Sequence, residues 1–241
     1  MNRFMASTFV AAACLVGAAP RSFAQARADG APAQAAAKPP VSDDNHFVYA
    51  DFEKADDNKK PISARGGEIG LFPYQSQGSR EAEAKGPELV HIKRDDPNHL
   101  LKFDYALFAG ADWTGVVLEI HGQPDVDGKM VSDDLSGYKT LSIDCYETGV
   151  TIVRVEIVSQ GRGKENAIQA PQDTFKVREG LNTYKIPLKA FSQPEWVKDE
   201  RVDPKEILRN LTSVKISVFC ENHCEANKQG MMILDNIVFE K

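Results

Sequence analysis

The C-terminal stretch "SVKISVFCENHCEANKQGMMILDNIVFEK" (213–241) decides the fold class of this chain. Its first residues alternate polar and apolar side chains, and the largely apolar "MMILDNIVFE" (231–240) closes the stretch after the polar segment "ENHCEANKQG" (221–230). A period of two is typical of a strand with one buried face, and Asn and Gly are common in the loops between strands. The stretch therefore predicts two consecutive β-strands joined by a loop.

The same period recurs upstream of this stretch. Strands are predicted at 100–108, 113–122, 138–147, 150–159 and 182–188. The inward residues are Leu101, Phe103, Tyr105 and Leu107, then Val116, Leu118 and Ile120, then Leu141, Ile143 and Cys145, and then Val153, Val155 and Ile157. The glycine-rich "RGGEIG" (65–70) is predicted as a turn or a β-bulge, and the following "FPYQ" (72–75) as a turn. Many short antiparallel strands predict an all-β fold, an antiparallel β-sandwich of the jelly-roll kind.

One short helix is predicted near 203–211, in "DPKEILRNL". Asp203 is a suitable N-cap residue, and Pro204 fits the first helical position because it lacks an N–H that the helix would leave unpaired. Ile207, Leu208 and Leu211 share one face of this helix, so we expect them to face the core.

The N-terminus has the three parts of a secretory signal peptide, predicted to span residues 1–24. "MNR" is basic, "FMASTFVAAACLVGAA" (4–19) is apolar, and "PRSFA" (20–24) places small residues at Ser22 and Ala24 before the cleavage site. The Ala/Pro-rich segment 25–44 has no periodic apolar face and is predicted to be a flexible linker. We therefore expect a periplasmic or secreted protein with one domain at 45–241 and no membrane span after cleavage.

Charge and motifs exclude several classes of function. The net charge of −6 and a pI near 5.5 argue against binding to nucleic acid, which requires a basic surface. The G-x-S-x-G, H-E-x-x-H and P-loop motifs are absent from the sequence, so we expect no enzyme activity. Glu119 and Glu156 are the one candidate acid/base pair, and an ion pair between Arg154 and Glu156 is the simpler explanation for the second acid.

The cysteines predict one disulfide. Cys14 is lost with the signal peptide, which leaves Cys145, Cys220 and Cys224 in an oxidising compartment. A Cys220–Cys224 bond closing the loop is the preferred pairing, and Cys145–Cys220 is the alternative because both cysteines are on the inward phase of their strands. A zinc site at Cys220, His223 and Cys224 lacks a fourth ligand.

A family resemblance covers about 45–241. It is carried by "FVYADFEK" (47–54), "GGEIGLFPYQ" (66–75), "DLSGYKTLSIDCYE" (134–147), "GLNTYKIPLKAFSQPEW" (180–196), "LTSVKISVF" (211–219) and "MMILDNIVFEK" (231–241). This order resembles the galactose-binding-like jelly rolls, in particular carbohydrate-binding modules and the complex I intermediate-associated protein family. The resemblance supports the jelly-roll fold and implies a binding role.

The resemblance also implies a structural calcium ion between the first and last strands. The residues of this chain at the matching positions are Asp51, Glu53 and Asp235. Calcium takes several oxygen ligands, and these three carboxylates supply oxygens of the required kind.

Members of the resembled family bind glycans on a sheet face or at the loop rim. Sugar rings stack their C–H faces on aromatic side chains and require polar groups for their hydroxyls. If their strands are neighbours, the residues expected to form this surface are Trp113, Glu119, Asp144, Tyr146, Arg154, Glu156 and Phe219. We therefore expect a non-catalytic carbohydrate-binding domain. A protein-interaction or assembly module of the intermediate-associated type is the alternative, and a polysaccharide-acting hydrolase or lyase is the third reading.

Overall fold

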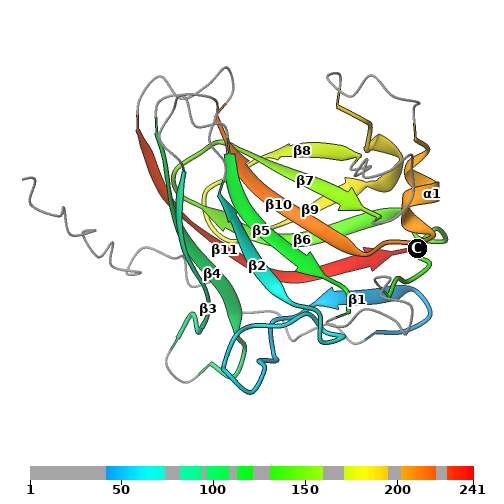
Figure 1. Cartoon of the computed structure of the whole chain (residues 1–241), viewed down its shortest axis with the longest axis horizontal. Helices are drawn as coiled ribbons and strands as arrows, with labels where there is room; N and C mark the ends of the chain where they lie inside the picture. Colours follow the sequence, from blue (N-terminus) through cyan, green and yellow to red (C-terminus); the bar gives the residue numbers. More distant parts are fainter. Residues whose placement is uncertain are drawn as a thin grey trace, which may run out of the picture. The chain divides into compact units, whose positions relative to one another are not determined.

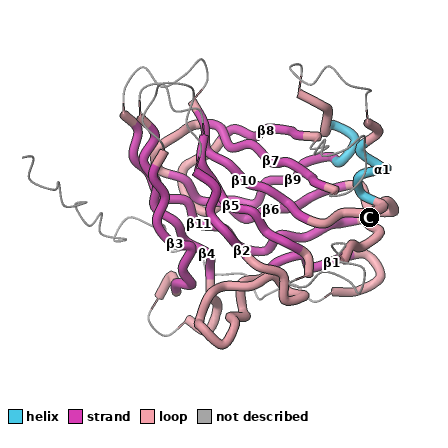
Figure 2. The backbone as a smooth tube through the Cα atoms, viewed as in Figure 1, coloured by secondary structure: helices cyan, strands magenta, loops and turns pink. Residues whose placement is uncertain are grey.

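Two antiparallel sheets pack face to face in the computed structural model (Figures 1 and 2). The structure describes residues 42–73, 82–93, 96–108, 113–121, 131–159, 171–194, 202–220 and 227–241. The six-stranded sheet consists of β3 (Glu83–Val90), β4 (Leu100–Leu107), β11 (Lys228–Glu240), β6 (Thr140–Glu147) and β9 (Asn182–Pro187), in that order, with β1 (His46–Ala50) also paired to β11. The five-stranded sheet consists of β2 (Ile69–Pro73), β5 (Trp113–Glu119), β10 (Ser213–Phe219), β7 (Ile152–Val158) and β8 (Gln172–Lys176), in that order.

The predicted all-β jelly-roll fold is confirmed, and so is the inward phase of its central strands. Leu141, Ile143 and Cys145 of β6 are fully buried, and Val153 and Val155 of β7 are as well. These residues belong to one apolar core to which both sheets contribute. The alternation of apolar and polar residues therefore identified which side of each central strand faces the core.

The sequence reading missed β2, β3 and β8, and each of these strands lies at the edge of a sheet. The "FPYQ" segment was predicted as a turn, but Phe72 and Pro73 belong to β2 and pair with β5. In β3, the register shifts between Lys85 and Glu88 around Gly86 and Pro87. An edge strand tolerates Pro and Gly because one side of its backbone has no ladder partner, so its sequence pattern is weak.

The short helix is confirmed as α1 (Pro204–Leu208), which is preceded by a 3₁₀ turn, η2 (Leu188–Ala190). The Asp203 side chain accepts a hydrogen bond from the Lys205 N–H at 2.9 Å, as expected of an N-cap. Ile207 and Leu208 are buried in the core.

Strand β11 changes its partner half-way along its length. Its first half pairs with β4 as far as Leu234 and Leu101, and its second half pairs with β1 from Ile237 onward. Between the two halves lies Asp235, followed by Asn236 with a φ of +44°. Asp235 is therefore placed where the ends of β1 and β4 leave a gap in the sheet.

Tyr49 of β1 connects the two sheets. Its hydroxyl donates to the carbonyl oxygen of Leu118 in β5 and accepts from the N–H of Val214 in β10 at 3.1 Å. Leu118 and Val214 are directly opposite each other in the five-stranded sheet. Tyr49 belongs to the six-stranded sheet, and its hydroxyl thus forms hydrogen bonds with two strands of the five-stranded sheet.

The described residues, which begin at 42, belong to one compact unit. The predicted signal peptide (1–24) and most of the predicted linker (25–44) lie outside the described residues. Among the residues that are described, no helix is long and apolar enough to cross a membrane.

Candidate functional site

The outer face of the five-stranded sheet brings together aromatic and cationic side chains from four strands. Phe219 of β10 is directly opposite Trp113 of β5. Arg154 of β7 is opposite Ser217 of β10, which is in turn opposite Gly115 of β5. The residues that define this surface, called the Trp113 face below, are Phe72, Trp113, Arg154, Lys215 and Phe219.

Arg154 is the centre of the Trp113 face. Its guanidinium carbon lies 4.7 Å from the centroid of the Trp113 ring and 5.3 Å from that of the Phe219 ring. Its Nε lies 3.2 Å from the Ser217 hydroxyl and 3.2 Å from a Glu156 carboxylate oxygen. Although it faces outward, Arg154 is only 8% exposed. Cation–π contacts and a charge-assisted pair therefore hold the two rings and the arginine in one arrangement.

Small residues let Arg154 extend across its neighbouring strand. Ser217 and Gly115 occupy the outward positions between Arg154 and Phe72, and neither has a long side chain. A Cβ at Gly115 would meet the Ile216 carbonyl oxygen and would lie 2.7 Å from the Ser217 Cα, so the close backbone approach requires glycine there. Gly70 of β2 has open space above it, with no heavy atom within 4 Å of a Cβ. The part of the Trp113 face between Arg154 and Phe72 therefore lies close to the backbone of the sheet, because no long side chain covers it.

A second cation–π contact lies beside the first. The Lys215 Nζ lies 5.8 Å from the centroid of the Phe72 ring. Lys215 is opposite Glu156 on one side and opposite Val117 on the other. The sequence reading missed both residues of this contact, Phe72 because its segment was read as a turn. The alternation in "SVKISVFC" does place Lys215 on the outward phase.

Four of the seven residues predicted to bind a ligand lie together on this face: Trp113, Arg154, Glu156 and Phe219. Glu119 is on the same face at the far end of β5, where burial and the neighbouring Glu68 raise its carboxyl pKa. The condition that the strands be neighbours is therefore met for β5, β7 and β10.

Asp144 and Tyr146 lie on the other sheet, in β6, and do not join the Trp113 face. Asp144 accepts hydrogen bonds from the Thr183 hydroxyl at 2.5 Å and from the Asn236 amide at 2.9 Å. Tyr146 is opposite Ile233 of β11. Strand β6 has the same alternation as β7, so the sequence alone did not reveal that its outward residues are on a different sheet.

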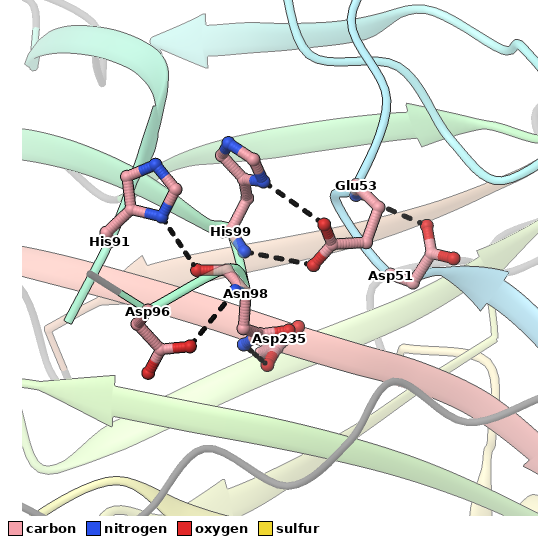
Figure 3. Close-up of polar contacts among 7 residues, drawn as sticks. All are labelled: Asp51, Glu53, His91, Asp96, Asn98, His99 and Asp235. Carbon is pink, nitrogen blue, oxygen red and sulfur yellow. Dashed lines mark hydrogen bonds and ion pairs between the residues drawn. The ribbon is translucent and has the colours of Figure 1, made fainter. Parts of the chain in front are cut away.

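The predicted calcium ligands lie at the gap between β1 and β4 (Figure 3). One carboxylate oxygen of Asp235 accepts from the Asn98 amide at 2.9 Å and from the Asn236 amide at 3.1 Å. The pKa of Asp235 is raised to about 7, chiefly by burial and also by the charges of Asp144 and Glu53. Asp235 is therefore a buried carboxyl with further carboxylates near it.

The other two predicted ligands have partners of their own. Glu53 accepts from the His99 N–H at 2.9 Å, and its second oxygen lies 3.1 Å from the His99 ring Nδ1. Asp51 accepts a long hydrogen bond of 3.4 Å from the Glu53 N–H. Within the described ranges, no three side chains of His, Cys, Asp or Glu come together in a group that would hold a metal ion.

Two buried amide oxygens at this gap have no hydrogen-bond partner, Asn98 Oδ1 and Asn236 Oδ1. Both amides point their NH₂ groups at the carboxylates instead. The O and N of an amide exchange places when the terminal torsion turns by half a rotation, and a cation would favour the oxygens. The residue types at the gap thus fit a hard cation, with both asparagines turned.

Cys145 is fully buried and free. Burial raises the pKa of its thiol well above the ordinary value. The alternative Cys145–Cys220 pairing is therefore excluded. Cys224 and His223 lie outside the described residues, so the preferred Cys220–Cys224 bond stays a prediction.

No protein-family model matches the sequence, and no curated protein matches it. Among solved structures, the chain is similar to a family 11 carbohydrate-binding module from Clostridium thermocellum in complex with a β-1,3-1,4-mixed-linked tetrasaccharide. The two are 15% identical with a TM-score of 0.52, over 83% of this chain and 97% of the module. A family 30 carbohydrate-binding module is 13% identical with a TM-score of 0.50, over 81% of this chain and 100% of that one.

The fold is an antiparallel jelly roll, which these carbohydrate-binding modules share. This finding agrees with the resemblance seen in the sequence, from the "FVYADFEK" opening to the "LDNIVFE" ending. At such low identity the similarity establishes the fold alone, and a ligand has to be argued from the residues of this chain.

Proposed function

We propose that the Trp113 face binds a carbohydrate chain without cleaving it. The observation that carries the proposal is the placement of Arg154 against both Trp113 and Phe219, above a floor of small residues. Aromatic rings match the C–H faces of sugars, and a fixed guanidinium matches their hydroxyl oxygens. Because the ion pair with Glu156 holds the arginine in place, binding orders few side chains and loses little entropy.

The carboxylates of this face support a binding role over catalysis. A Glu156 carboxylate oxygen lies 3.2 Å from the Arg154 Nε, so this carboxylate is already paired with a neighbouring side chain. Glu119 and Glu156 are opposite different residues of β10, Ser213 and Lys215, so a whole strand runs between them. Glycosidases place two carboxyl groups about 5 to 10 Å apart on either side of one bond.

Affinity electrophoresis of the full chain against soluble polysaccharides, with β-1,3-1,4-glucan in the panel, tests the proposal. We expect retardation by at least one polysaccharide. Trp113→Ala should weaken that binding about tenfold or more, since buried aromatic residues commonly dominate a binding surface. Tyr146→Ala is the matched control because Tyr146 is on the other sheet, and it should bind as the native chain does.

Two outcomes would contradict the proposal. One is that no polysaccharide retards the native chain. The other is that Trp113→Ala and Tyr146→Ala weaken binding equally. A protein partner captured by the native chain and lost by Trp113→Ala, without any glycan binding, would favour the assembly-module alternative.

We also propose that calcium binds at the gap between β1 and β4 through Asp235. The two partnerless amide oxygens and the raised pKa of Asp235 support this, since a cation would satisfy the oxygens and neutralise the buried charge. A ligand of the folded state raises the melting temperature. We expect millimolar calcium to raise the Tm and a chelator to reverse the rise, with Asp235→Asn insensitive to both. Equal Tm values in calcium and chelator would contradict the site.

We further infer that the protein is secreted or periplasmic and carries a Cys220–Cys224 disulfide. The support is the signal-peptide pattern of residues 1–24 and the buried, free state of Cys145, which removes one alternative pairing. Mass spectrometry of the protein from its native host tests both inferences. A mature N-terminus at Gln25 and a mass two hydrogens below that of the reduced form are expected.

A further inference from the structure

A cleft of about 730 Å³ lies among η2, α1 and the segment that leads into β6, and its described lining contains none of the residues that define the Trp113 face. Its lining includes Tyr138, Lys139, Lys189, Asp203, Lys205 and Leu208. Helix α1 and the C-terminus lie at this same end of the sandwich (Figure 1). We call it the Lys189 cleft. Its volume is in the range of pockets that bind small organic ligands.

Backbone hydrogen bonds join the walls of the cleft to one another. The Leu188 N–H donates to the Lys139 carbonyl at 2.8 Å, which joins η2 to the segment before β6. The Leu135 N–H donates to the Leu208 carbonyl at 2.7 Å, which joins the same segment to α1. The Lys139 N–H donates to the Glu240 carbonyl at 2.8 Å. The cleft is therefore formed in advance of any ligand.

Three lysines from three separate elements line this cleft: Lys139, Lys189 and Lys205. Each is exposed, and none forms an ion pair with a described residue. Among the described lining residues, Asp203 is the one carboxylate, and it accepts a hydrogen bond from the Lys205 N–H as the cap of α1. On a chain with a net charge of −6, this is a local concentration of positive charge.

The remaining described lining is mostly apolar or aromatic, and Ser136 and Thr140 add two hydroxyl groups. Leu188 and Leu208 are buried, and Tyr138 presents a half-buried ring. Lys241 adds a fourth ammonium 5.7 Å from the centroid of the Tyr138 ring. An inorganic anion would leave this apolar surface uncovered in so large a cleft, whereas an acidic sugar has both charged groups and apolar ring faces.

We propose that the Lys189 cleft is a second binding site, which takes an acidic oligosaccharide through its carboxylate groups. The three ammonium groups bind the carboxylates, and Tyr138 and the leucines contact the ring faces. The site is independent of the Trp113 face and of the function proposed for that face. A chain with both sites would hold neutral and acidic glycans at different places.

Isothermal titration calorimetry of the full chain with tri-galacturonate tests the proposal, and the methyl-esterified trisaccharide is the neutral counterpart. We expect binding of the acid form that weakens as salt is added, and about tenfold or more weaker binding of the ester. Lys189→Glu should weaken the acid form by a similar factor. Lys176→Glu changes an exposed lysine of β8 outside the cleft and should not.

Several outcomes would contradict the proposal. No heat with the native chain, equal binding of acid and ester, or unchanged binding by both Lys189→Glu and a Lys139→Gln/Lys205→Gln variant would exclude the site. Loss of tri-galacturonate binding in Trp113→Ala would assign the ligand to the Trp113 face instead. Binding of citrate or inorganic phosphate as tightly as tri-galacturonate would show a general anion site. Because Lys189 is exposed, the variants should keep the native melting temperature, which the same samples can confirm.

Discussion

The two sheets of this sandwich use their outward polar residues in different ways. On the six-stranded sheet, charges are paired with each other: Lys102 lies 3.1 Å from Glu88 and 3.0 Å from Asp104, and Lys185 lies 2.8 Å from Glu240. On the five-stranded sheet, Arg154 and Lys215 lie over aromatic rings, and Arg154 pairs with Glu156 as well.

The buried carboxyls with the strongly raised pKa values, Glu147 and Asp235, also belong to the six-stranded sheet. Replacing polar residues of the six-stranded sheet should therefore change mainly the stability of the fold. Replacing outward residues of the five-stranded sheet should change mainly ligand binding. Replacements in the two sheets should therefore affect different properties of the protein.

The largest effect is expected from Gly230→Ala in β11. A Cβ at Gly230 would lie 2.6 Å from the Tyr105 Cζ and 2.8 Å from the Gly149 nitrogen, and Tyr105 is only 2% exposed. We expect the free energy of unfolding to fall by about 3 kcal/mol, because neither neighbour can move without disturbing the core. Gly70→Ala in β2, which has open space above it, is the control and should change it by less than about 0.5 kcal/mol. If urea denaturation showed the same loss of unfolding free energy for Gly230→Ala and Gly70→Ala, the predicted difference between the two sheets would be wrong.

The next effect is a pH dependence that comes from Glu147. This carboxyl accepts from the Tyr105 hydroxyl and from the Gly149 N–H at 2.6 Å, and burial raises its pKa to about 7 from an ordinary value of 4.5. The folded state thus binds a proton at Glu147 more tightly than the unfolded state does. The contribution of Glu147 to the free energy of unfolding is therefore largest below pH 4.5 and is lost as the pH rises to about 7. The expected loss between pH 5 and pH 8 is about 2 to 3 kcal/mol.

Glu147→Gln isolates this contribution from other titrating groups. Glutamine imitates the protonated acid and does not titrate, so the variant should match the native chain near pH 5 and be more stable near pH 8. Denaturation curves at both pH values give the comparison. If the free energies of unfolding of the native chain and the variant differed by the same amount at pH 5 and pH 8, Glu147 would not be the source of the pH dependence.

Tyr49→Phe tests whether the division between the sheets is complete. The hydroxyl of Tyr49 belongs to the six-stranded sheet but pairs with Leu118 and Val214 of the other sheet. Its removal leaves buried partners unsatisfied, which should cost about 1 to 2 kcal/mol of stability. Tyr146→Phe, on the outer face of β6, should cost less than about 0.5 kcal/mol. If the two variants were equally stable, the bridge between the sheets would contribute nothing.

The smallest effect is expected from Lys102→Met. Its two partners are exposed to solvent, with side-chain exposures of 58% for Glu88 and 41% for Asp104. Exposed ion pairs contribute little and are screened by salt, so the loss should be under about 1 kcal/mol and should shrink further in 1 M salt. A larger, salt-independent loss would show that the paired charges of this sheet are structural.

Much of the fold was predictable from local pattern. The phase of β6 and β7 and the Asp203 cap of α1 were correctly predicted from neighbouring residues in the sequence. The edge strands β2, β3 and β8 were not, because they contact the core on fewer sides and contain Pro, Gly or polar residues. Phe72 was lost from the candidate site together with β2.

The sequence alone was sufficient to predict the central strands, the buried side of each of them, and a core large enough for a sandwich. Only the tertiary structure decided that Trp113, Arg154 and Phe219 meet while Tyr146 lies on the other sheet. The physical reason is that alternation is set by the backbone of one strand, over two residues. The neighbour of a strand is set by pairing between segments far apart in the chain, and alternation contains no information about which segments pair.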